Sequence, residues 1–470
     1  MSTIPAFIIG ATRSGGGKTT LTVGIIAALV RKGLRVQCFK CGPDFIDPTL
    51  HQIVSSAPSY NLDLNMMGSS CCKATFADKC RGSDVAVIEG VMGLFDGGEA
   101  STAALAKALD IPVVLIVDAA SCAQSAAAML KGFQEYDPEL RVNGVIFNRI
   151  GSPRHRELID TAVREQCRVD YAGYMERDES FTIPERHLGL HMGDEDPLSE
   201  TALDTLARSV EKNIDLGMIL DLSGRNGEKE TDTVRKPVKR QTTATGGPKV
   251  RVGVARDEAF CFYYQQNFEL MEEAGFELVE FSPIHDPFLP GGLDMLYFGG
   301  GYPENHGGKL CDNRSIREQI LSFYEQRRPI YGECGGFMYL CRSLTDMDGT
   351  CRDMVGIFPF DAVMNRRLRR LGYRRSRLVD SCILGRAGDI LHGHEFHYSD
   401  IDYDGVSDLP AGVKTLYQLD NNSHEGYSIG SAVGSYIHLH FGNTPSVLKH
   451  LLRHIHHQQA GSSIDVNDNT

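Results

Sequence analysis

Apolar and polar residues follow one another in blocks that predict buried strands separated by helices in the first half of the chain. The apolar runs are short and nearly uninterrupted, which is typical of parallel strands covered on both faces. Helices are expected at Leu21–Val30, at Thr102–Leu109 and across 194–219. The predicted strands are Phe7–Ile9, Leu34–Phe39, Asp84–Glu89, Pro112–Val117 and Val142–Phe147. Strands that alternate with helices predict an α/β domain with a doubly wound parallel sheet.

This pattern stops at residue 223 and restarts at residue 249. Segment 223–248 is rich in charge, Thr and Gly, and its only large apolar residues are two valines, so it is predicted to be a flexible linker. A second α/β domain should follow, with a helix at Phe260–Gly275 and strands at Lys249–Ala255, Phe276–Ser282, Met295–Phe298 and 329–331. We therefore expect domains at 1–222 and 249–458, with a C-terminal tail at 459–470.

Composition narrows the class of protein. A chain of 470 residues predicts two or three domains, and its formal net charge of −13 argues against nucleic acid or an anionic membrane as partner. No apolar run is long enough to cross a bilayer. Thirteen cysteines, an odd number, without a secretory signal indicate reduced thiols in a cytoplasmic protein.

The glycine-rich stretch after the first strand predicts a phosphate site. Between the strand and the helix lies RSGGGKTT, whose backbone amides and helix start suit a nucleoside triphosphate. Lys18 can reach the outer phosphates and the Thr19 hydroxyl can hold Mg²⁺. The strict loop pattern fails by one position, because Thr12 replaces its first glycine, and Arg13 is a candidate phosphate contact. The expected nucleotide contacts are Ser14, Gly15, Gly16, Gly17, Lys18, Thr19 and Thr20.

Acidic and amide side chains follow the other predicted strands. Glu89 ends an apolar strand, the position from which a second carboxylate places Mg²⁺ in P-loop proteins. Asp44 and Asp47 lie in KCGPDFIDP after another strand, and could orient Mg²⁺ or substrate, or only cap a helix. Asn148 could recognise adenine, or cap a turn. Glu185, Arg186 and His187 could contact an anionic substrate, with a solvated turn as the alternative.

The second domain contains a candidate nucleophile. Cys334 lies in GECGG between a predicted strand and a predicted helix, which is typical of a nucleophile elbow whose helix dipole lowers the thiol pKa. The amides of Gly300 and Gly301 could form an oxyanion hole. His438 and His440 are two residues apart on a predicted strand and so lie on the same face. Either histidine could therefore be the base for the thiol. Segment 389–399, with three histidines and Glu395, is interpreted as a polar, substrate-facing loop rather than a metal site.

These motifs together resemble the cobyrinic acid a,c-diamide synthases over nearly the whole chain. The stretches that carry the resemblance are SGGGKTT, KCGPDFIDP, VIEGVMGLFDG, GVIFNRIGSPRH, PERHLGL, DEAFCFYYQQN, YFGGGYPE, YGECGGFMYL, GHEFHYS and SYIHLHF. The resemblance implies two doubly wound domains: an N-terminal dethiobiotin-synthetase-like P-loop domain and a C-terminal class I glutamine amidotransferase domain. It also implies a cytoplasmic enzyme of cobalamin biosynthesis.

The resemblance further implies a reaction. Glutamine is hydrolysed at Cys334 through a thioester, with His438 activating the thiol, and the ammonia travels to the first domain. There ATP and Mg²⁺ activate a carboxylate as an acyl phosphate, and the a and c acetate groups of cobyrinic acid become amides. Metal ligands are then Thr19, Asp44 and Glu89; Asn148 belongs to the ATP site. Substrate binding or carboxylate activation falls to Lys40, Asp44, Asp47, Glu185, Arg186 and His187.

One departure and several alternatives stay open. Class I enzymes usually have a glutamate two residues after the catalytic histidine, but His440 stands there, so Cys334 and His438 act as a dyad or with a glutamate from elsewhere. The same chemistry could serve hydrogenobyrinic acid or nickel-sirohydrochlorin. A partition-type ATPase with an inactive amidotransferase domain is a more distant alternative, which the elbow thiol disfavours. Expected partners are cobyrinic acid, L-glutamine and ATP, without nucleic acid or membrane, and a homodimer is a candidate assembly.

Overall fold

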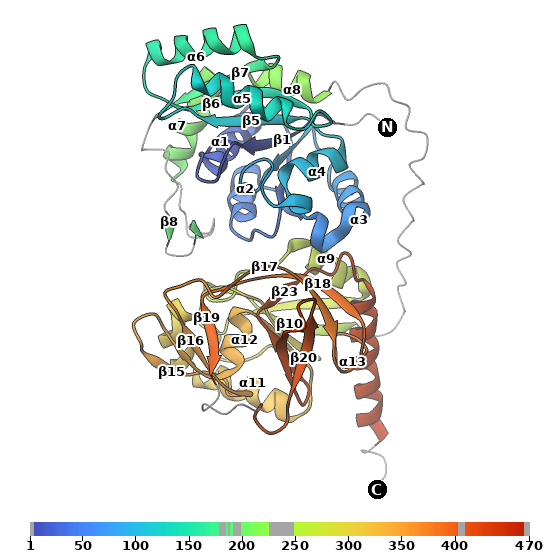
Figure 1. Ribbon diagram of the computed structural model, residues 1–470. Helices are drawn as coiled ribbons and strands as arrows, with labels where there is room; N and C mark the ends of the chain where they lie inside the picture. Colours follow the sequence, from blue (N-terminus) through green and yellow to red (C-terminus); the bar gives the residue numbers. More distant parts are fainter. Residues whose placement is uncertain are drawn as a thin grey trace. The chain divides into compact units, whose positions relative to one another are not determined.

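The computed structural model describes residues 4–177, 185–186, 189–190, 199–224, 249–402 and 409–464, with side chains of the last helix described to residue 457. The chain divides into two compact units, Met1–Pro237 and Val238–Thr470 (Figure 1). No helix in these described ranges combines the length and the apolar character needed to cross a membrane.

The first unit is built on a seven-stranded sheet in the order β3-β2-β4-β1-β5-β6-β7, with every pair parallel. Its strands are β1 (Ala6–Ala11), β2 (Val36–Cys41), β3 (Tyr60–Leu62), β4 (Val85–Glu89), β5 (Val113–Asp118), β6 (Val142–Ile150) and β7 (Asp170–Glu176). Successive residues of β1 belong to different cores, Ile8 to one and Phe7 and Ile9 to the other, so both faces are buried. The predicted doubly wound α/β class is confirmed.

Helices cover both faces of this sheet (Figure 1). One face carries α1 (Lys18–Arg31), α2 (Asp47–Ser55), α7 (Glu200–Asn213) and α8 (Leu216–Gly224), and the other carries α3 (Leu64–Lys79), α4 (Thr102–Leu109), α5 (Ser125–Glu135) and α6 (Pro153–Gln166). Strand β1 pairs with β4 on one side and β5 on the other. The chain therefore leaves β1 at the point where strand order reverses, which is where open α/β sheets bind ligands.

The boundaries of the last helical region differ from the prediction. Helices α7 and α8 are separate, because Ile214 is extended (φ −123°) and forms an isolated bridge with Gly173. Residues 194–198 lie outside the described residues, as do 225–248 of the predicted linker, whose first two residues belong to α8. In the second unit α13 (Ser446–Ile464) continues into the segment predicted as a tail.

The second unit contains a ten-stranded sheet in the order β11-β10-β12-β13-β22-β21-β20-β17-β18-β23, parallel from β11 to β22 and antiparallel beyond. These strands are β10 (Val250–Ala255), β11 (Phe276–Phe281), β12 (Met295–Phe298), β13 (Ile330–Glu333), β17 (Arg370–Leu378), β18 (Ile390–His397), β20 (Val413–Leu419), β21 (His424–Ile429), β22 (Ala432–Ser435) and β23 (Ile437–Leu439).

A four-stranded sheet and several helices complete the second unit (Figure 1). The sheet consists of β14 (Cys341–Thr345), β15 (Cys351–Asp353), β16 (Phe358–Met364) and β19 (Ser399–Asp402). The helices besides α13 are α9 (Gln265–Ala274), α10 (Gly307–Asp312), α11 (Arg314–Glu325) and α12 (Gly335–Leu340).

Two predictions for the second unit were wrong. The helix expected at Phe260–Gly275 begins only at Gln265, because Phe260 and Phe262 form bridges with Asp257 and Gly300. Segment 389–399 is no loop: most of it is strand β18, hydrogen-bonded to β17 on one side and β23 on the other. Its buried polar side chains have partners inside the sheet, which the residue types alone did not indicate.

Candidate functional sites

The phosphate loop connects β1 to α1 through left-handed glycines. Gly15 and Gly17 have φ of +71° and +86°, and a Cβ on Gly17 would lie 2.2 Å from Asn148 Nδ2. Glycine at 17 is therefore required both by backbone conformation and by space. Lys18 follows as the first residue of α1, so its side chain leaves from the helix start, where the dipole favours anions.

Two side chains from β6 donate hydrogen bonds to backbone carbonyls of this loop. Asn148 donates from Nδ2 to the Gly16 carbonyl (2.9 Å), and Arg149 donates to the Gly15 carbonyl (3.1 Å). Arg149 also pairs with Asp118 at 2.8 Å, and Asp118 pairs with Arg13 at 2.5 Å. The structure thus gives Asn148 a loop-bracing contact; its role toward adenine, and that of Arg13 toward phosphate, stay predictions.

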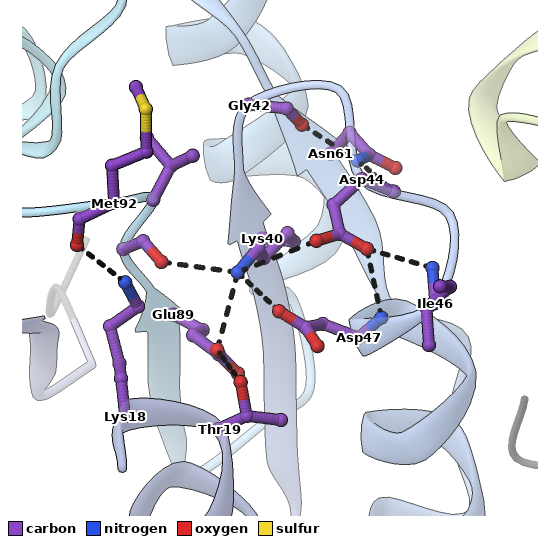
Figure 2. Close-up of polar contacts among 12 residues, drawn as sticks. Lys18, Thr19, Lys40, Gly42, Asp44, Ile46, Asp47, Asn61, Glu89 and Met92 are labelled. Atoms are coloured by element: carbon purple, nitrogen blue, oxygen red, sulfur yellow. Dashed lines mark hydrogen bonds and ion pairs between the residues drawn. The ribbon is translucent and has the colours of Figure 1, made fainter. Parts of the chain in front are cut away.

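Lys18 and Thr19 point across the loop toward β4 and the segment after it (Figure 2). Lys18 Nζ donates to the Met92 carbonyl at 2.8 Å, and Thr19 Oγ1 donates to Glu89 Oε1 at 2.8 Å. Burial, followed by repulsion from Lys40, lowers the pKa of Lys18 to about 8. The Lys18 ammonium has a neutral backbone carbonyl as its partner. A charge-assisted hydrogen bond to a phosphate would be stronger than this one.

A second, fully buried ammonium lies among the acids of this site (Figure 2). Lys40 Nζ contacts Asp47, Glu89 Oε1 (3.2 Å) and the Gly90 carbonyl (3.1 Å), and lies 3.9 Å from Asp44 Oδ2. Burial alone would lower the pKa of Lys40, but the charges of Asp47 and Glu89 outweigh it and raise that pKa. Lys40 is therefore charged. The structure places it on β2 rather than in the loop after the strand.

Glu89 is fixed by a histidine that the sequence analysis did not identify. Glu89 is fully buried, and its Oε2 lies 2.8 Å from His51 Nε2, whose Nδ1 lies 3.1 Å from Ser59 Oγ. Burial acts to raise the pKa of Glu89, but Lys40 and His51 together hold it well below its ordinary value. His51 stands four residues after Asp47 on α2, a helical spacing that could have indicated a shared face.

Asp44 serves as a cap and also faces the ammonium. Its Oδ1 accepts from the amides of Ile46 (2.8 Å) and Asp47 (3.0 Å) at the start of α2, as the capping alternative predicted. Asn61 Nδ2 donates to the carbonyls of Gly42 (2.8 Å) and Asp44 (2.7 Å) and so holds this loop (Figure 2). One Asp44 oxygen still points into the site.

The oxygen atoms at this site are of the kind that Mg²⁺ prefers. A hydroxyl from Thr19 and carboxylates from Glu89 and Asp44 fit a cation that takes one or two carboxylates, substrate phosphates and water. Within the described ranges no cluster of three or more His, Cys, Asp or Glu forms a preformed metal cage.

The remaining candidates of the first unit are described only in part. Glu185 and Arg186 form strand β8 (Glu185–Arg186), which pairs with β9 (Gly189–Leu190), but only their backbone is described. His187 lies outside the described residues. A contact between these three residues and substrate stays a prediction.

The candidate nucleophile lies at a sharp turn in the second unit. Cys334 connects β13 to α12 with φ +46° and ψ −108°, a strained conformation for a residue with a side chain. A Cβ on Gly335 would lie 2.8 Å from Pro303 Cδ, and one on Gly336 would lie 2.3 Å from the Phe298 carbonyl oxygen. The glycines after Cys334 are thus needed for the close approach of two backbone segments.

Gly300 lies between Cys334 and one of the two candidate histidines. A Cβ on Gly300 would be 2.3 Å from His438 Cε1, 3.2 Å from His438 Nε2 and 3.4 Å from Cys334 Cβ. His440 instead packs its ring on Tyr264, with centroids 5.1 Å apart. The geometry therefore places Gly300 next to both His438 and Cys334, while an oxyanion role for the Gly300 and Gly301 amides stays a prediction.

The resting thiol and imidazole are both neutral. Burial, followed by the charge of Glu304, raises the pKa of Cys334 well above its ordinary value, against a smaller opposing effect of the Gly335 amide. The predicted lowering of this pKa by the helix dipole was therefore wrong, because desolvation dominates. Burial, with His394 and His397 nearby, lowers the pKa of His438 to about 3. Thiolate formation thus requires a proton acceptor, and that His438 is this acceptor stays a prediction.

Known proteins resemble this chain along both units. A family model described as a CobQ/CobB/MinD/ParA nucleotide binding domain matches residues 7–190, and a CobB/CobQ-like glutamine amidotransferase domain matches residues 251–446. The cobyrinate a,c-diamide synthase of Syntrophotalea carbinolica is 42% identical over 452 residues, covering 95% of this chain and 97% of that protein. Enzymes of the same name from Listeria monocytogenes and Salmonella typhimurium are 39% and 37% identical; they cover 94% and 95% of this chain, and 98% and 97% of their own length. The chain belongs to the cobyrinate a,c-diamide synthase family.

Proposed function

We propose that this chain is an ATP- and glutamine-dependent carbon–nitrogen ligase that converts the a and c acetate groups of cobyrinic acid to carboxamides. One observation carries the proposal: about 95% of the chain aligns with enzymes of that name. The two sites supply the two chemical capacities that such a ligase needs, a phosphate loop with buried acids and a thiol beside a neutral histidine.

The first site suits activation of a carboxylate. A carboxylate is a poor electrophile, so its oxygen attacks the γ-phosphorus of ATP, ADP leaves, and an acyl phosphate forms. Lys18 and the helix start stabilise the negative charge of the phosphates, and Thr19 and Glu89 would hold Mg²⁺. Bound Mg²⁺ would neutralise phosphate charge. Ammonia then attacks the acyl carbon, and phosphate leaves to give the carboxamide.

The second site suits release of ammonia from glutamine. His438 accepts the Cys334 proton, the thiolate attacks the glutamine amide carbon, and the tetrahedral oxyanion points at the Gly300 and Gly301 amides. The amide nitrogen leaves as ammonia after taking the proton back from His438, which leaves a thioester. Water then hydrolyses the thioester to glutamate and frees the thiol.

The proposal is tested by product formation. Purified protein with ATP, Mg²⁺, glutamine and cobyrinic acid should give a product whose mass corresponds to two amidations. Cys334→Ala should lose product formation from glutamine and keep it with concentrated ammonium chloride. Lys18→Ala should lose both. A Cys334→Ala protein that is fully active on glutamine would contradict the nucleophile assignment.

The tetrapyrrole is resolved by parallel assays. Cobyrinic acid, hydrogenobyrinic acid and nickel-sirohydrochlorin share the reacting acetate groups, so each is offered with glutamine under identical conditions. The proposal expects the highest kcat/KM with cobyrinic acid. A higher kcat/KM with either of the others would keep the ligase chemistry and reassign the substrate, and ATP hydrolysis with no amidation of any of them would contradict the ligase.

A further inference from the structure

A glutamate next to the nucleophile in the chain lies beside the catalytic histidine in space. Glu333 Oε2 is 3.9 Å from His438 Nδ1, and each of these side chains is only 3% exposed. A Cβ on Gly300 would lie 3.2 Å from Nε2 and 3.4 Å from Cys334 Cβ, so Nε2 is the ring nitrogen on the side of Gly300 and Nδ1 is the one that faces Glu333. The carboxylate is therefore placed behind the imidazole as seen from Gly300.

The carboxylate of Glu333 is held by three donors, one from its own strand β13, one from β12 and one from β23. Oε1 accepts from the Tyr331 hydroxyl (2.5 Å) and the Leu439 amide (3.0 Å), while among the described residues Oε2 accepts only from the Tyr297 hydroxyl (3.0 Å). A carboxylate oxygen can accept two hydrogen bonds, so Oε2 retains capacity on the side of His438. The bond to Leu439 also fixes the strand residue directly after His438.

Two other glutamates of this unit, Glu395 and Glu425, have hydrogen-bond partners of their own. Glu395 accepts from Arg374 Nε (2.5 Å) and pairs with His397 Nε2 (2.8 Å). Glu425 accepts from the Ser435 hydroxyl (2.6 Å) and the Tyr436 amide (2.8 Å). Neither set of contacts includes His438, whereas Glu333 lies 3.9 Å from His438 Nδ1 and accepts from the amide of the next residue, Leu439.

Proton transfer from Cys334 creates an imidazolium at a position that water does not reach. A positive charge formed there is costly unless an opposite charge is near, and a carboxylate about 4 Å away is close enough to stabilise it. Contacts of this kind are often long in a resting enzyme and shorten when substrate binds. Position 440, where the wider class has its glutamate, holds a histidine that packs on Tyr264 instead.

We propose that Glu333 is the positioning residue of the glutamine-hydrolysing site: it orients His438 through Nδ1 and stabilises the imidazolium formed when Cys334 is deprotonated. This inference rests on the proposed function. Glu333 keeps its own proton state during the transfer; the thiol proton moves to His438 Nε2 and then to the departing ammonia. The third member of the site thus comes from the elbow itself, one residue before the nucleophile.

The ionisation of Glu333 gives this role a pH signature. Burial raises the pKa of Glu333 to about 7, against the opposing effect of its three donors. The titratable groups that face it are Tyr331, Tyr297, Tyr263, Tyr417, Cys334 and His438. Burial raises the pKa of each tyrosine above its ordinary value, so the tyrosines stay neutral near pH 7. Glutamine hydrolysis should therefore increase as pH rises through about 7.

The test compares the full-length Glu333→Gln variant with the full-length wild type. Two rates are measured for each: glutamine hydrolysis and amidation driven by ammonia. Gln keeps the shape but carries no negative charge, so kcat for glutamine should fall by about 100-fold with KM changed less than threefold, and the increase near pH 7 should disappear. Glu333→Asp should recover part of kcat. Glu425→Gln is the matched control, expected within threefold of the wild type.

Ammonia-driven amidation separates failure of this inference from failure of the proposed function. If the wild type makes no amide from ammonia, the proposed function fails. If Glu333→Gln amidates with ammonia and hydrolyses glutamine within threefold of the wild type, the positioning role is overturned.

Alkylation of Cys334 by iodoacetamide, detected by peptide mass, is a second measurement that serves if Glu333→Gln folds poorly. In this measurement Cys334 of Glu333→Asp should react more slowly than Cys334 of the wild type at pH 8. Faster reaction would mean that Glu333 only repels the thiolate, which would also overturn the role.

Discussion

The two sites of this chain differ in whether their buried ionisable side chains are charged or neutral. At the phosphate loop, Lys40 and Glu89 are buried and both charged, each kept so by the other and by neighbouring side chains. At the elbow, Cys334 and His438 are also buried but both neutral, because burial dominates and the nearby charged side chains act in the same direction as burial. Similar burial therefore produces different protonation, and the difference lies in how close and how numerous the opposite charges are.

This difference matches the ligands that each site is proposed to take. ATP and Mg²⁺ are charged, so a site with fixed charges needs little reorganisation when they bind. Glutamine presents a neutral carboxamide, and a neutral pair meets it without an unpaired buried charge. Charge at the elbow then needs to form only during reaction, which is the step that Glu333 is inferred to assist.

The largest effect is expected from removing the ammonium at the centre of the charged site. Lys40→Met leaves Glu89 and Asp47 facing each other in a buried position, so the free energy of unfolding should fall by about 3–5 kcal/mol. Amidation from glutamine and from ammonia should both be lost. Urea denaturation followed by circular dichroism, with both assays, measures these outcomes.

A second substitution serves as the control for that charge balance. Lys40→Met combined with Asp47→Asn removes one negative charge together with the positive one, so part of the lost stability should return. If the single variant were as stable as the wild type, the contrast between a charged and a neutral site would be wrong at its charged end.

An intermediate effect is expected from filling the space between thiol and imidazole. Gly300→Ala places a Cβ 2.3 Å from His438 Cε1, so the ring must move and glutamine hydrolysis should fall by about 100-fold or more. Ammonia-driven amidation should persist, because the first unit is unchanged. Gly291→Ala is the matched control, since a Cβ there meets no atom within 4 Å. Retained hydrolysis in Gly300→Ala would place His438 outside the reaction.

The sequence was informative where local pattern and chemistry coincide. The apolar runs predicted five strands of the first sheet but not β3 or β7, and the glycines around Lys18 and Cys334 marked turns that the structure shows to need glycine. Local pattern also predicted the start of the second sheet, from β10 to β13. The family resemblance added the reaction, which no local pattern specifies.

The sequence was uninformative where partners are distant along the chain. His51 on α2 contacts Glu89 on β4, and Glu333 on β13 lies 3.9 Å from His438 on β23, although the members of each pair are far apart in sequence. The polar strand β18 was misread as a loop for the same reason, since its polar residues find partners within the sheet. The pKa of Cys334 was predicted in the wrong direction because burial cannot be read from the motif.

The smallest expected effect tests whether burial keeps the elbow region neutral. Burial lowers the pKa of His440 to about 3, whereas a histidine in an unfolded chain titrates near 6.5. Below pH 6.5 the unfolded chain therefore binds a proton that the native protein does not, and His440 lowers native stability as pH falls. His440→Phe keeps a ring against Tyr264 and lacks this proton. Its stability relative to the wild type should thus improve by up to about 1.4 kcal/mol per pH unit between pH 6.5 and 5.

Urea denaturation at pH 7.5, 6.5 and 5.5 measures the difference in free energy of unfolding. Ile437→Val, a nearby core change without an ionisable group, should show no such change with pH. If the difference in free energy of unfolding between His440→Phe and the wild type did not change with pH, His440 could be protonated in the native protein. The contrast between the two sites would then rest on Cys334 and His438 alone.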